Sequence, residues 1–243
     1  MKHALRIVLL LLLCTAALQL VFALRVALML FIDPQSTTFQ RSEAWRLLSE
    51  QHRILWSQSW VDAEHIAPTL KRAVIASEDA GFVDHGGVDW PAIEKAWGRN
   101  QVAEKRAERQ QQRQPDKAVA AKLVGGSTIT QQLAKNLFLS GERTVLRKAQ
   151  ELALTLLLEA LLSKQRILEI YLNNVEWGEG VFGAQAAARH YFRVDAARLG
   201  AEQAARLAVM LPAPKRFEKR PNSAYVVGRA ATIVARMGAV QAP

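Results

Sequence analysis

The sequence predicts a mainly α-helical domain that follows one N-terminal membrane-spanning helix. Between Ile7 and Leu24 it carries no charged residue, and an apolar run of this length can cross a bilayer. Further along the chain, apolar residues recur at helical spacing and no alternating strand pattern of any length occurs. A hydrophobic content of 50% over 243 residues gives such a domain enough material for a buried core.

The N-terminal apolar segment is expected to be retained as an anchor. Lys2 and Arg6 precede it, so the positive-inside tendency predicts a cytoplasmic N-terminus and an extracytoplasmic remainder. A cleaved signal peptide is the alternative, but the apolar run is long for one and resumes after Arg25. Residues 1–32 are therefore assigned to a cytoplasmic N-terminus and a transmembrane anchor.

Charge and cysteine content narrow the classes of function. The net charge is +10, and a basic domain beside a bilayer suits anionic lipid head groups or a pyrophosphate, although basic residues also serve only to orient and solubilise. No cysteine follows Cys14, which excludes disulfides and thiolate chemistry from the domain. Nucleic acid is excluded as a partner, because the domain is extracytoplasmic and aromatic residues are not interleaved with the basic ones.

The remainder of the chain divides into a short connecting region and one domain. Residues 33–64 are expected to form a linker and a membrane-proximal segment, in which residues 42–60 form an amphipathic helix at the membrane surface or pack in the ordinary way. The domain is assigned to residues 65–243. Within it residues 99–122 are polar and low in complexity, which favours a mobile basic loop.

Helical periodicity marks the core of the domain. Pro68 suits the first turn of a helix that should end near Gly81. Further helices are expected over residues 144–173, 184–191 and 201–210, with a glycine-rich break at 175–183 and an end to the regular pattern at the three prolines of 211–221.

Two adjacent carboxylates are the first candidate for chemistry. Glu78 and Asp79 fall at the C-terminal end of the helix that begins at Pro68, where the helix dipole and their mutual repulsion both raise a carboxylate pKa. A raised pKa suits a general base or acid. The alternative is that both side chains are solvated or cap neighbouring amides.

A polar helix face is the second candidate. Two glycines at 125–126 lead into a helix start at which Thr128 and Gln131 match a capping box, and a helix N-terminus of this kind binds phosphate well. Gln132 and Lys135 continue the same face at helical spacing, opposite an apolar face. An ordinary amphipathic helix is an equal alternative at this stage.

A charged cluster is the third candidate. Arg143, Arg147, Lys148 and Glu151 lie close in sequence, and Glu151 can pair with Arg147 four residues away or with Lys148 three residues away. Such a pair on an exposed face would contribute little. The motifs HExxH, GxSxG and GxxxxGK are absent, which disfavours zinc proteases, α/β-hydrolases and P-loop enzymes.

Five segments taken together resemble the ordered motifs of the family 51 glycosyltransferases, over about residues 65–215. They are EDAGFVDHGGVD (78–89), GGSTITQQLAKN (125–136), RKAQE (147–151), KQRILEIYLN (164–173) and EGVFGAQAAARHYF (179–192). The transpeptidase motifs SxxK and KTG of the bifunctional relatives do not follow, so the chain resembles the monofunctional members.

The resemblance implies a lysozyme-like fold and the polymerisation of peptidoglycan glycan strands. The growing lipid-linked glycan chain is the donor, and its transfer to the 4-hydroxyl of lipid II inverts the donor carbon and releases undecaprenyl pyrophosphate. The implied partners are lipid II, the lipid-linked glycan chain, the bacterial membrane and other cell-wall synthesis or division proteins. The resemblance also implies that the anchor lies in the inner membrane of the cell and that the domain is periplasmic.

The resemblance also assigns roles to residues by position. Glu78 and Glu151 are implied as catalytic, with Glu78 the general base. Asp79, Phe82 and His85 support the base, and Ser127, Lys135 and Arg143 surround the donor pyrophosphate. Thr128, Gln131, Gln132, Asn136, Arg147 and Lys148 are further motif residues. A divalent metal such as Mg²⁺ at Glu151 is left open.

Two other functions compete with this one. A lytic muramidase also uses a helical lysozyme-like domain with one essential glutamate, but cleavage of a neutral sugar linkage gives Lys135 and Arg143 nothing to hold. A catalytically silent membrane scaffold for wall synthesis is the other alternative. The intact acidic and basic motif residues argue against silence.

Overall fold

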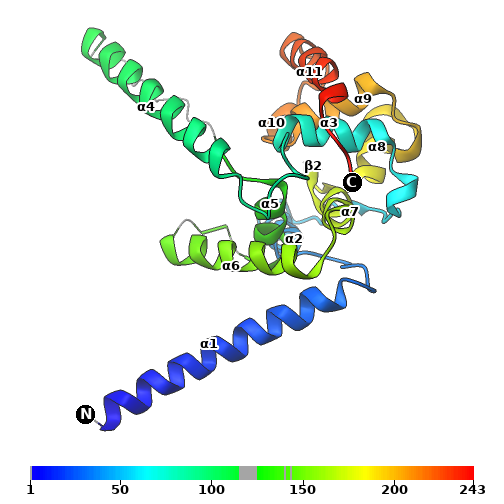
Figure 1. Ribbon diagram of the computed structural model, residues 1–243. Coiled ribbons are helices and arrows are strands. Elements are labelled where there is room, and N and C mark those ends of the chain that lie inside the picture. The colour runs from blue at the N-terminus through cyan, green and yellow to red at the C-terminus, as the bar shows by residue number, and fades with distance from the viewer. Residues whose placement is uncertain (1, 115–124, 140, 143) are drawn as a thin grey trace.

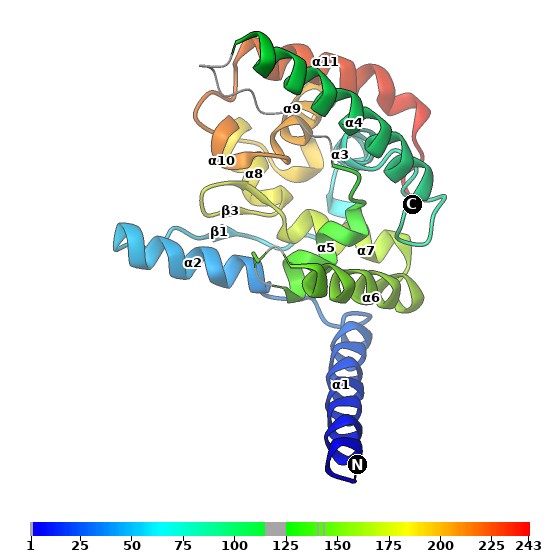
Figure 2. The ribbon, with the colours of Figure 1, turned by 90° about the vertical axis from the view of Figure 1, so that its left-hand side faces the viewer.

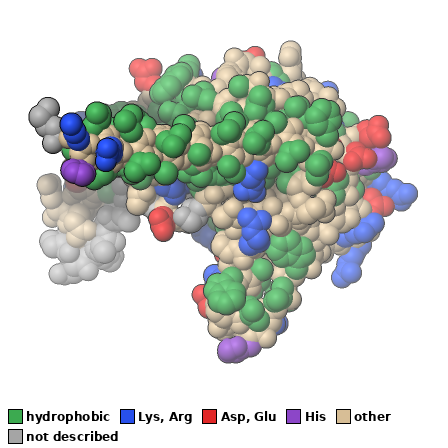
Figure 3. Space-filling model, turned by 90° about the horizontal axis from the view of Figure 1, so that it is seen from below, with side chains coloured by type: hydrophobic (Ala, Val, Ile, Leu, Met, Phe, Trp, Pro, Cys, Tyr) green, Lys and Arg blue, Asp and Glu red, His purple; other side chains and the backbone are tan. Residues whose placement is uncertain are grey.

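The computed structural model describes residues 2–114, 125–139, 141–142 and 144–243. It consists of a helical body from which two long helices project (Figure 1). Helix α1 (Lys2–Leu28) is one of them, and its length and composition suffice to cross a membrane. Figure 3 shows hydrophobic side chains exposed along this helix, with basic side chains gathered at its free end. The expected membrane-spanning candidate is therefore present.

The body holds the C-terminal end of α1 through specific contacts. Phe22 packs edge-on against Phe138, with 5.4 Å between the ring centroids. Beyond the helix, Arg166 donates hydrogen bonds from Nε to the carbonyl oxygen of Met29 (2.8 Å) and from Nη2 to Oδ1 of Asp33 (2.7 Å). The junction between α1 and the body is thus fixed by packing and by a charge-assisted hydrogen bond.

Helix α2 (Thr38–Gln51) belongs to the body. Thr37 and Gln40 form a capping box at its start, so the helix begins four residues before the segment expected from sequence, and it ends at His52 in a left-handed conformation. The side chain of Thr38 donates to the carbonyl oxygen of Leu137 at 2.9 Å, and that of Gln40 donates to the carbonyl oxygen of Asn174 at 3.0 Å. Residues 33–64, expected as a linker and membrane-proximal segment, therefore include a helix that is bonded into the domain.

Two groups of helices build the core. Helices α3 (Pro68–Glu78), α9 (Ala201–Met210) and α11 (Ala224–Arg236) pack together at one end. Helices α5 (Ile129–Phe138), α6 (Val145–Leu161) and α7 (Lys164–Asn174) pack at the other, with Ser163 capping α7 where the long leucine-rich region divides. Helix α11 lies beyond the prolines of residues 211–221, at which the sequence predicts the end of the regular pattern, so this prediction is wrong.

A small sheet connects the two groups. Strands β1 (Ser57–Gln58), β2 (Glu176–Gly178) and β3 (Val181–Phe182) form it in the order β1-β3-β2, with β1 parallel and β2 antiparallel to β3. Gly183 follows with φ +82°, and a Cβ there would lie 2.6 Å from the carbonyl oxygen of Asn173. The glycine-rich break before α8 (Ala184–Phe192) is therefore a hairpin with Gly180 in its turn at φ +73°, followed by Gly183 as the N-cap of α8. Short helical turns fill the remaining connections: η1 (Ala63–His65), η2 (Ala196–Arg198), α10 (Pro214–Phe217) and η3 (Met237–Ala239).

The mobile basic loop expected over residues 99–122 is wrong for its first part. Residues 99–113 belong to helix α4 (Trp90–Arg113), whose start is capped by Asp89 and which projects from the body (Figures 1 and 2). The segment is polar, but it consists mostly of Ala, Glu, Gln, Lys and Arg, which are the strongest helix formers among polar and small residues. Residues 115–122 lie outside the described part of the chain.

Candidate active site

Glu78 is the last residue of α3, and its half-buried carboxylate points toward α5. Its Oε2 accepts a hydrogen bond of 3.0 Å from Nε2 of Gln132. The amide oxygen of Gln132 in turn accepts a hydrogen bond of 2.9 Å from the hydroxyl of Tyr171, which lies buried in α7. The tyrosine hydroxyl fixes the amide orientation, so Gln132 presents its donor to the carboxylate.

The environment of Glu78 makes its carboxylate a stronger base than an exposed glutamate. Burial removes water from the charged form and is the largest influence raising the pKa. Hydrogen bonds from Gln132 and Ser77 oppose this effect, and the neighbouring negative charge of Asp79 adds to it. The net result is a raised pKa, as the sequence suggested, although burial contributes more than repulsion.

Asp79 is buried and joins three segments of the chain. Its Oδ1 lies 2.8 Å from Nε2 of His85, and its Oδ2 accepts a hydrogen bond of 3.0 Å from the backbone of Ile129 at the start of α5. Nδ1 of His85 accepts from the backbone of Gly87 at 3.1 Å, so the proton shared with Asp79 is on Nε2. Burial raises the pKa of Asp79 despite these partners. Asp79 therefore fixes the end of α3 against the start of α5.

Phe82 supports the same turn from beneath. Its side chain is fully buried, and the ammonium group of Lys164 lies 4.5 Å from the centre of its ring. Lys164 also forms an ion pair of 2.8 Å with Glu159. The supporting positions proposed for Phe82 and His85 thus both lie in the turn that follows Glu78.

The start of α5 has the capping box expected from sequence. The side chain of Thr128 accepts from the backbone of Gln131, and the side chain of Gln131 accepts from the backbone of Thr128, both at 3.1 Å. The hydroxyl of Thr128 also donates to the carbonyl oxygen of Gly87 at 2.7 Å. The side chain of Thr128 is therefore committed to positioning the helix, while Gln132 is turned to Glu78.

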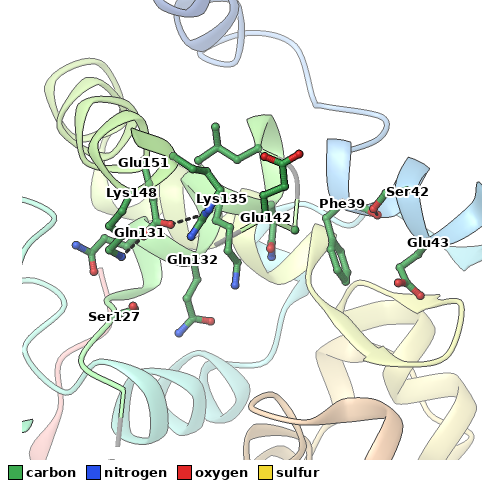
Figure 4. Close-up of a pocket in the computed structure, with 14 residues that line it drawn as sticks. Phe39, Ser42, Glu43, Ser127, Gln131, Gln132, Lys135, Glu142, Lys148 and Glu151 are labelled. Carbon is green, nitrogen blue, oxygen red and sulfur yellow. Dashed lines mark hydrogen bonds and ion pairs between the residues drawn. The ribbon is translucent and has the colours of Figure 1, made fainter. Parts of the chain in front are cut away.

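A cavity of about 430 Å³ lies between α2, α5 and α6, and it is lined by Gln132, the partner of Glu78. Figure 4 shows the lining side chains converging from these three helices. Eight of the residues singled out from sequence line it: Ser127, Gln131, Gln132, Lys135, Asn136, Arg147, Lys148 and Glu151. The structure thus brings the second and third sequence motifs together around one space.

Glu151 organises the cationic wall of this cavity. Its buried carboxylate forms an ion pair of 2.9 Å with Arg147 and a second ion pair with Lys148, so both partners expected from sequence are used at once. The pairs hold the guanidinium and the ammonium beside the cavity, where Lys135 also lies. Arg143 lies outside the described residues.

The fit of a metal ion can be judged from the donor groups. Both carboxylate oxygens of Glu151 already have cationic partners, and in the described residues Glu151 belongs to no group of acidic and histidine side chains that could hold an ion. Asp79, His85 and Asp89 do form such a group, but Asp79 and His85 bond each other and Asp89 caps α4. The geometry therefore gives Glu151 a role in placing cations rather than in binding Mg²⁺.

Sequence reasoning missed several residues of the site. Tyr171 falls within the fourth motif, but its position on the buried face of α7 made it resemble a core residue. Phe39, Ser42 and Glu43 of α2 form the third wall of the cavity. The only signal for Ser42 and Glu43 was the weak helical periodicity of residues 42–60, which does not indicate what the helix faces, and Phe39 lies before that segment.

Comparison with known proteins agrees with this arrangement. Residues 48–238 match the family described as "Transglycosylase". The protein called "Biosynthetic peptidoglycan transglycosylase" of Burkholderia pseudomallei (strain K96243) is 50% identical over 227 residues, which cover 93% of this chain and 82% of the relative. Its namesake of Burkholderia vietnamiensis (strain G4 / LMG 22486) is also 50% identical, over 93% of this chain and 86% of the relative.

The family match begins at residue 48, so it includes α5, α6 and the last residues of α2. The similarity to the relatives covers 93% of the chain and therefore includes all of α2. The mainly helical body agrees with the lysozyme-like fold of this family. The chain therefore belongs to the transglycosylase family, as a peptidoglycan glycosyltransferase of the biosynthetic, monofunctional type.

Proposed function

We propose that Glu78 is the general base of glycan-strand polymerisation and that the cavity beside it receives the donor pyrophosphate. The observation that carries the proposal is the hydrogen bond from Gln132 to Glu78, because Gln132 also lines the cavity. One side chain thus joins the base to the space where the leaving group would lie.

In the proposed step, the 4-hydroxyl oxygen of lipid II attacks C1 of the lipid-linked glycan chain from the face opposite the pyrophosphate. The new C1–O bond forms as the bond between C1 and the pyrophosphate oxygen breaks, so the configuration at C1 inverts. The hydroxyl proton passes to Glu78, whose raised pKa favours accepting it. Undecaprenyl pyrophosphate leaves with the bonding electron pair.

The departing pyrophosphate gains negative charge during this step, and cations placed in advance stabilise that charge. Lys135, Arg147 and Lys148 are the described cations of the cavity, with Ser127 as a further hydrogen-bonding group and Asn136 beside them. Arg143 is proposed to join them on the strength of its motif position. Glu151 acts by holding Arg147 and Lys148 in place.

The membrane context is part of the proposal. Helix α1 would anchor the chain in the bacterial inner membrane with the N-terminus in the cytoplasm and the body in the periplasm, where Lys2 and Arg6 at the helix start agree with the positive-inside tendency. Both lipid-linked substrates are confined to the same membrane. Other wall-synthesis or division proteins are proposed as partners in the cell.

To test this proposal, purified protein is incubated with lipid II in detergent, and polymer is separated from monomer on a gel. Polymer from the wild type that a muramidase digests, and none from a folded Glu78→Gln variant, is the expected result. Polymer from Glu78→Gln at the wild-type rate would remove Glu78 as the base. Cleavage of preformed glycan without polymer would favour a lytic muramidase instead.

A further inference from the structure

Helix α4 carries its basic and its acidic residues on different faces, and the proposed reaction uses neither face. Residues at spacings of three, four and seven share one face of a helix. One such face carries cations at each position except Val102, which fills the gap between the second and third of them. These cations are Lys95, Arg99, Arg106, Arg109 and Arg113. We call this set the cationic face of α4.

The acidic residues of the helix lie on its other side. Glu94, Glu104 and Glu108 share that side with Trp97 and Gln101, and Lys105 lies between the two faces. Most of the cations have no acidic residue three or four positions away on the helix. Internal ion pairs therefore stabilise the helix little. The pattern is that of a charged stripe rather than of a self-neutralised helix.

The cationic face is open to solvent. All five of its cations are exposed, and none of them forms an ion pair with another residue in the described parts of the chain. Ala96 is the only residue of α4 that counts as buried. Folding of the body therefore does not explain why five cations are aligned along a helix that leaves it.

The direction of α4 indicates what these cations meet. Figure 1 shows α4 and α1 leaving the body on the same side, and Figure 2, viewed from that side, shows α4 in front of α11. The cationic face extends over about 27 Å at 1.5 Å per residue, which suits a broad anionic surface better than a single anion. With Val102 as its only apolar member, it suits contact with head groups rather than insertion among lipid tails.

We propose that the cationic face of α4 binds the anionic phospholipid head groups of the membrane in which α1 is anchored. Basic residues close to an anionic surface are attracted to it, and the attraction extends only over about one Debye length. Five aligned cations thus provide a second, salt-sensitive contact with the bilayer beside the apolar one. The contact depends on the proposed anchoring by α1 but not on the chemistry of Glu78.

A fluorescence experiment on the full chain tests this contact. In a Cys14→Ser background, a fluorophore is attached to Val102→Cys within the cationic face or to Gln101→Cys on the other side. Each protein is placed in phosphatidylcholine vesicles with or without phosphatidylglycerol, and nitroxide-bearing lipids serve as quenchers. We expect severalfold stronger quenching at residue 102 when phosphatidylglycerol is present, less at residue 101, and loss of the effect at high salt.

A matched pair of charge variants separates the stripe from net charge. Arg106→Gln, Arg109→Gln and Arg113→Gln together remove three positive charges from the cationic face. Gln101→Glu, Lys105→Gln and Gln112→Glu change the net charge equally on the other side of the helix. The first set should abolish the quenching at residue 102, and the second should leave most of it.

Several outcomes would overturn the proposal. Equal quenching in neutral and anionic vesicles would show that the contact is not electrostatic, and equal loss in both triple variants would show attraction by net charge alone. A label at residue 102 that is never quenched would show that the cationic face does not contact lipid, and an acidic protein would then be its alternative partner. Polymerisation of lipid II in detergent reports on the proposed function separately, so failure of one does not imply failure of the other.

Discussion

Nε2 of Gln132 donates a hydrogen bond of 3.0 Å to the carboxylate of Glu78, across 54 positions of sequence. The oxygen of the same amide accepts a hydrogen bond from the hydroxyl of Tyr171. An aromatic residue of the core thus sets the orientation of the Gln132 amide, which contacts the proposed base. This relationship makes the protonation of Glu78 sensitive to residues that do not contact substrate.

Gln132→Leu should shift the pH dependence of polymerisation. Loss of the hydrogen bond removes an influence that lowers the pKa of Glu78, so the base stays protonated to higher pH. The acidic limb of kcat/KM against pH should move upward, and the rate near neutral pH should fall by roughly 10- to 100-fold. Tyr171→Phe should shift it in the same direction by less, and an unchanged acidic limb in both variants would contradict the coupling.

Glu151→Gln and Lys148→Met should separate stability from activity. The side chain of Glu151 is 4% exposed, so removing its charge leaves Arg147 unpaired and should cost about 1–3 kcal/mol of unfolding free energy. Lys148 is 53% exposed, and its replacement should cost little stability. Both variants should lose polymerisation. Denaturant unfolding and the lipid II assay measure the two effects, and an active, fully stable Glu151→Gln would refute this account of the cationic wall.

Glu176→Gln should remove a pH dependence of stability. Burial raises the pKa of Glu176 to about 7, and Glu43 and Glu218 add to the shift while Lys215 opposes it. The folded state therefore binds this proton more tightly than the unfolded state, so its contribution is present below the unfolded pKa and is lost as pH rises toward 7. Wild type should lose on the order of 3 kcal/mol between pH 4.5 and 7 through this group. Unfolding curves at several pH values should be flatter for the variant over this window.

Gly183→Ala should destabilise the junction between β3 and α8. The residue has φ +82°, and an added Cβ would lie 2.6 Å from the carbonyl oxygen of Asn173. Backbone strain should lower the free energy of unfolding by about 1–3 kcal/mol, and the steric clash should lower it further. Gly228→Ala in α11 is the control, because nothing lies within 4 Å of its added Cβ, and it should gain about 0.5–1 kcal/mol. Thermal unfolding of both variants decides the comparison.

Local patterns in the sequence predicted local structure well. The place of Glu78 at the C-terminal end of α3, the capping box of Thr128 and the pairing of Glu151 with residues three and four positions earlier all depend on helical periodicity and short-range hydrogen bonds. The helix itself ends three residues before Gly81, where its end was predicted. Such features are determined within one or two turns, so the sequence contains nearly all the information that they need.

Features that depend on tertiary packing were not predicted. Glu43 lines the cavity because α2 packs against α5, where Thr38 donates a hydrogen bond to the carbonyl oxygen of Leu137, far away in sequence. Residues 99–113 were expected as a loop because their polar composition gave no apolar face, yet their intrinsic propensity produces a helix without one. Periodicity detects packing faces, and a helix that packs on little escapes it.

The fixed junction at Arg166 has a consequence for how the enzyme responds to its lipid environment. A helix with a long apolar stretch tilts when the bilayer becomes thinner. If α1 spans the bilayer as proposed, the bonds of Arg166 to Met29 and Asp33 connect such a tilt to the orientation of the body. Bilayer thickness would then set the angle at which the cavity meets the lipid surface, and so how easily a lipid-borne sugar reaches Glu78.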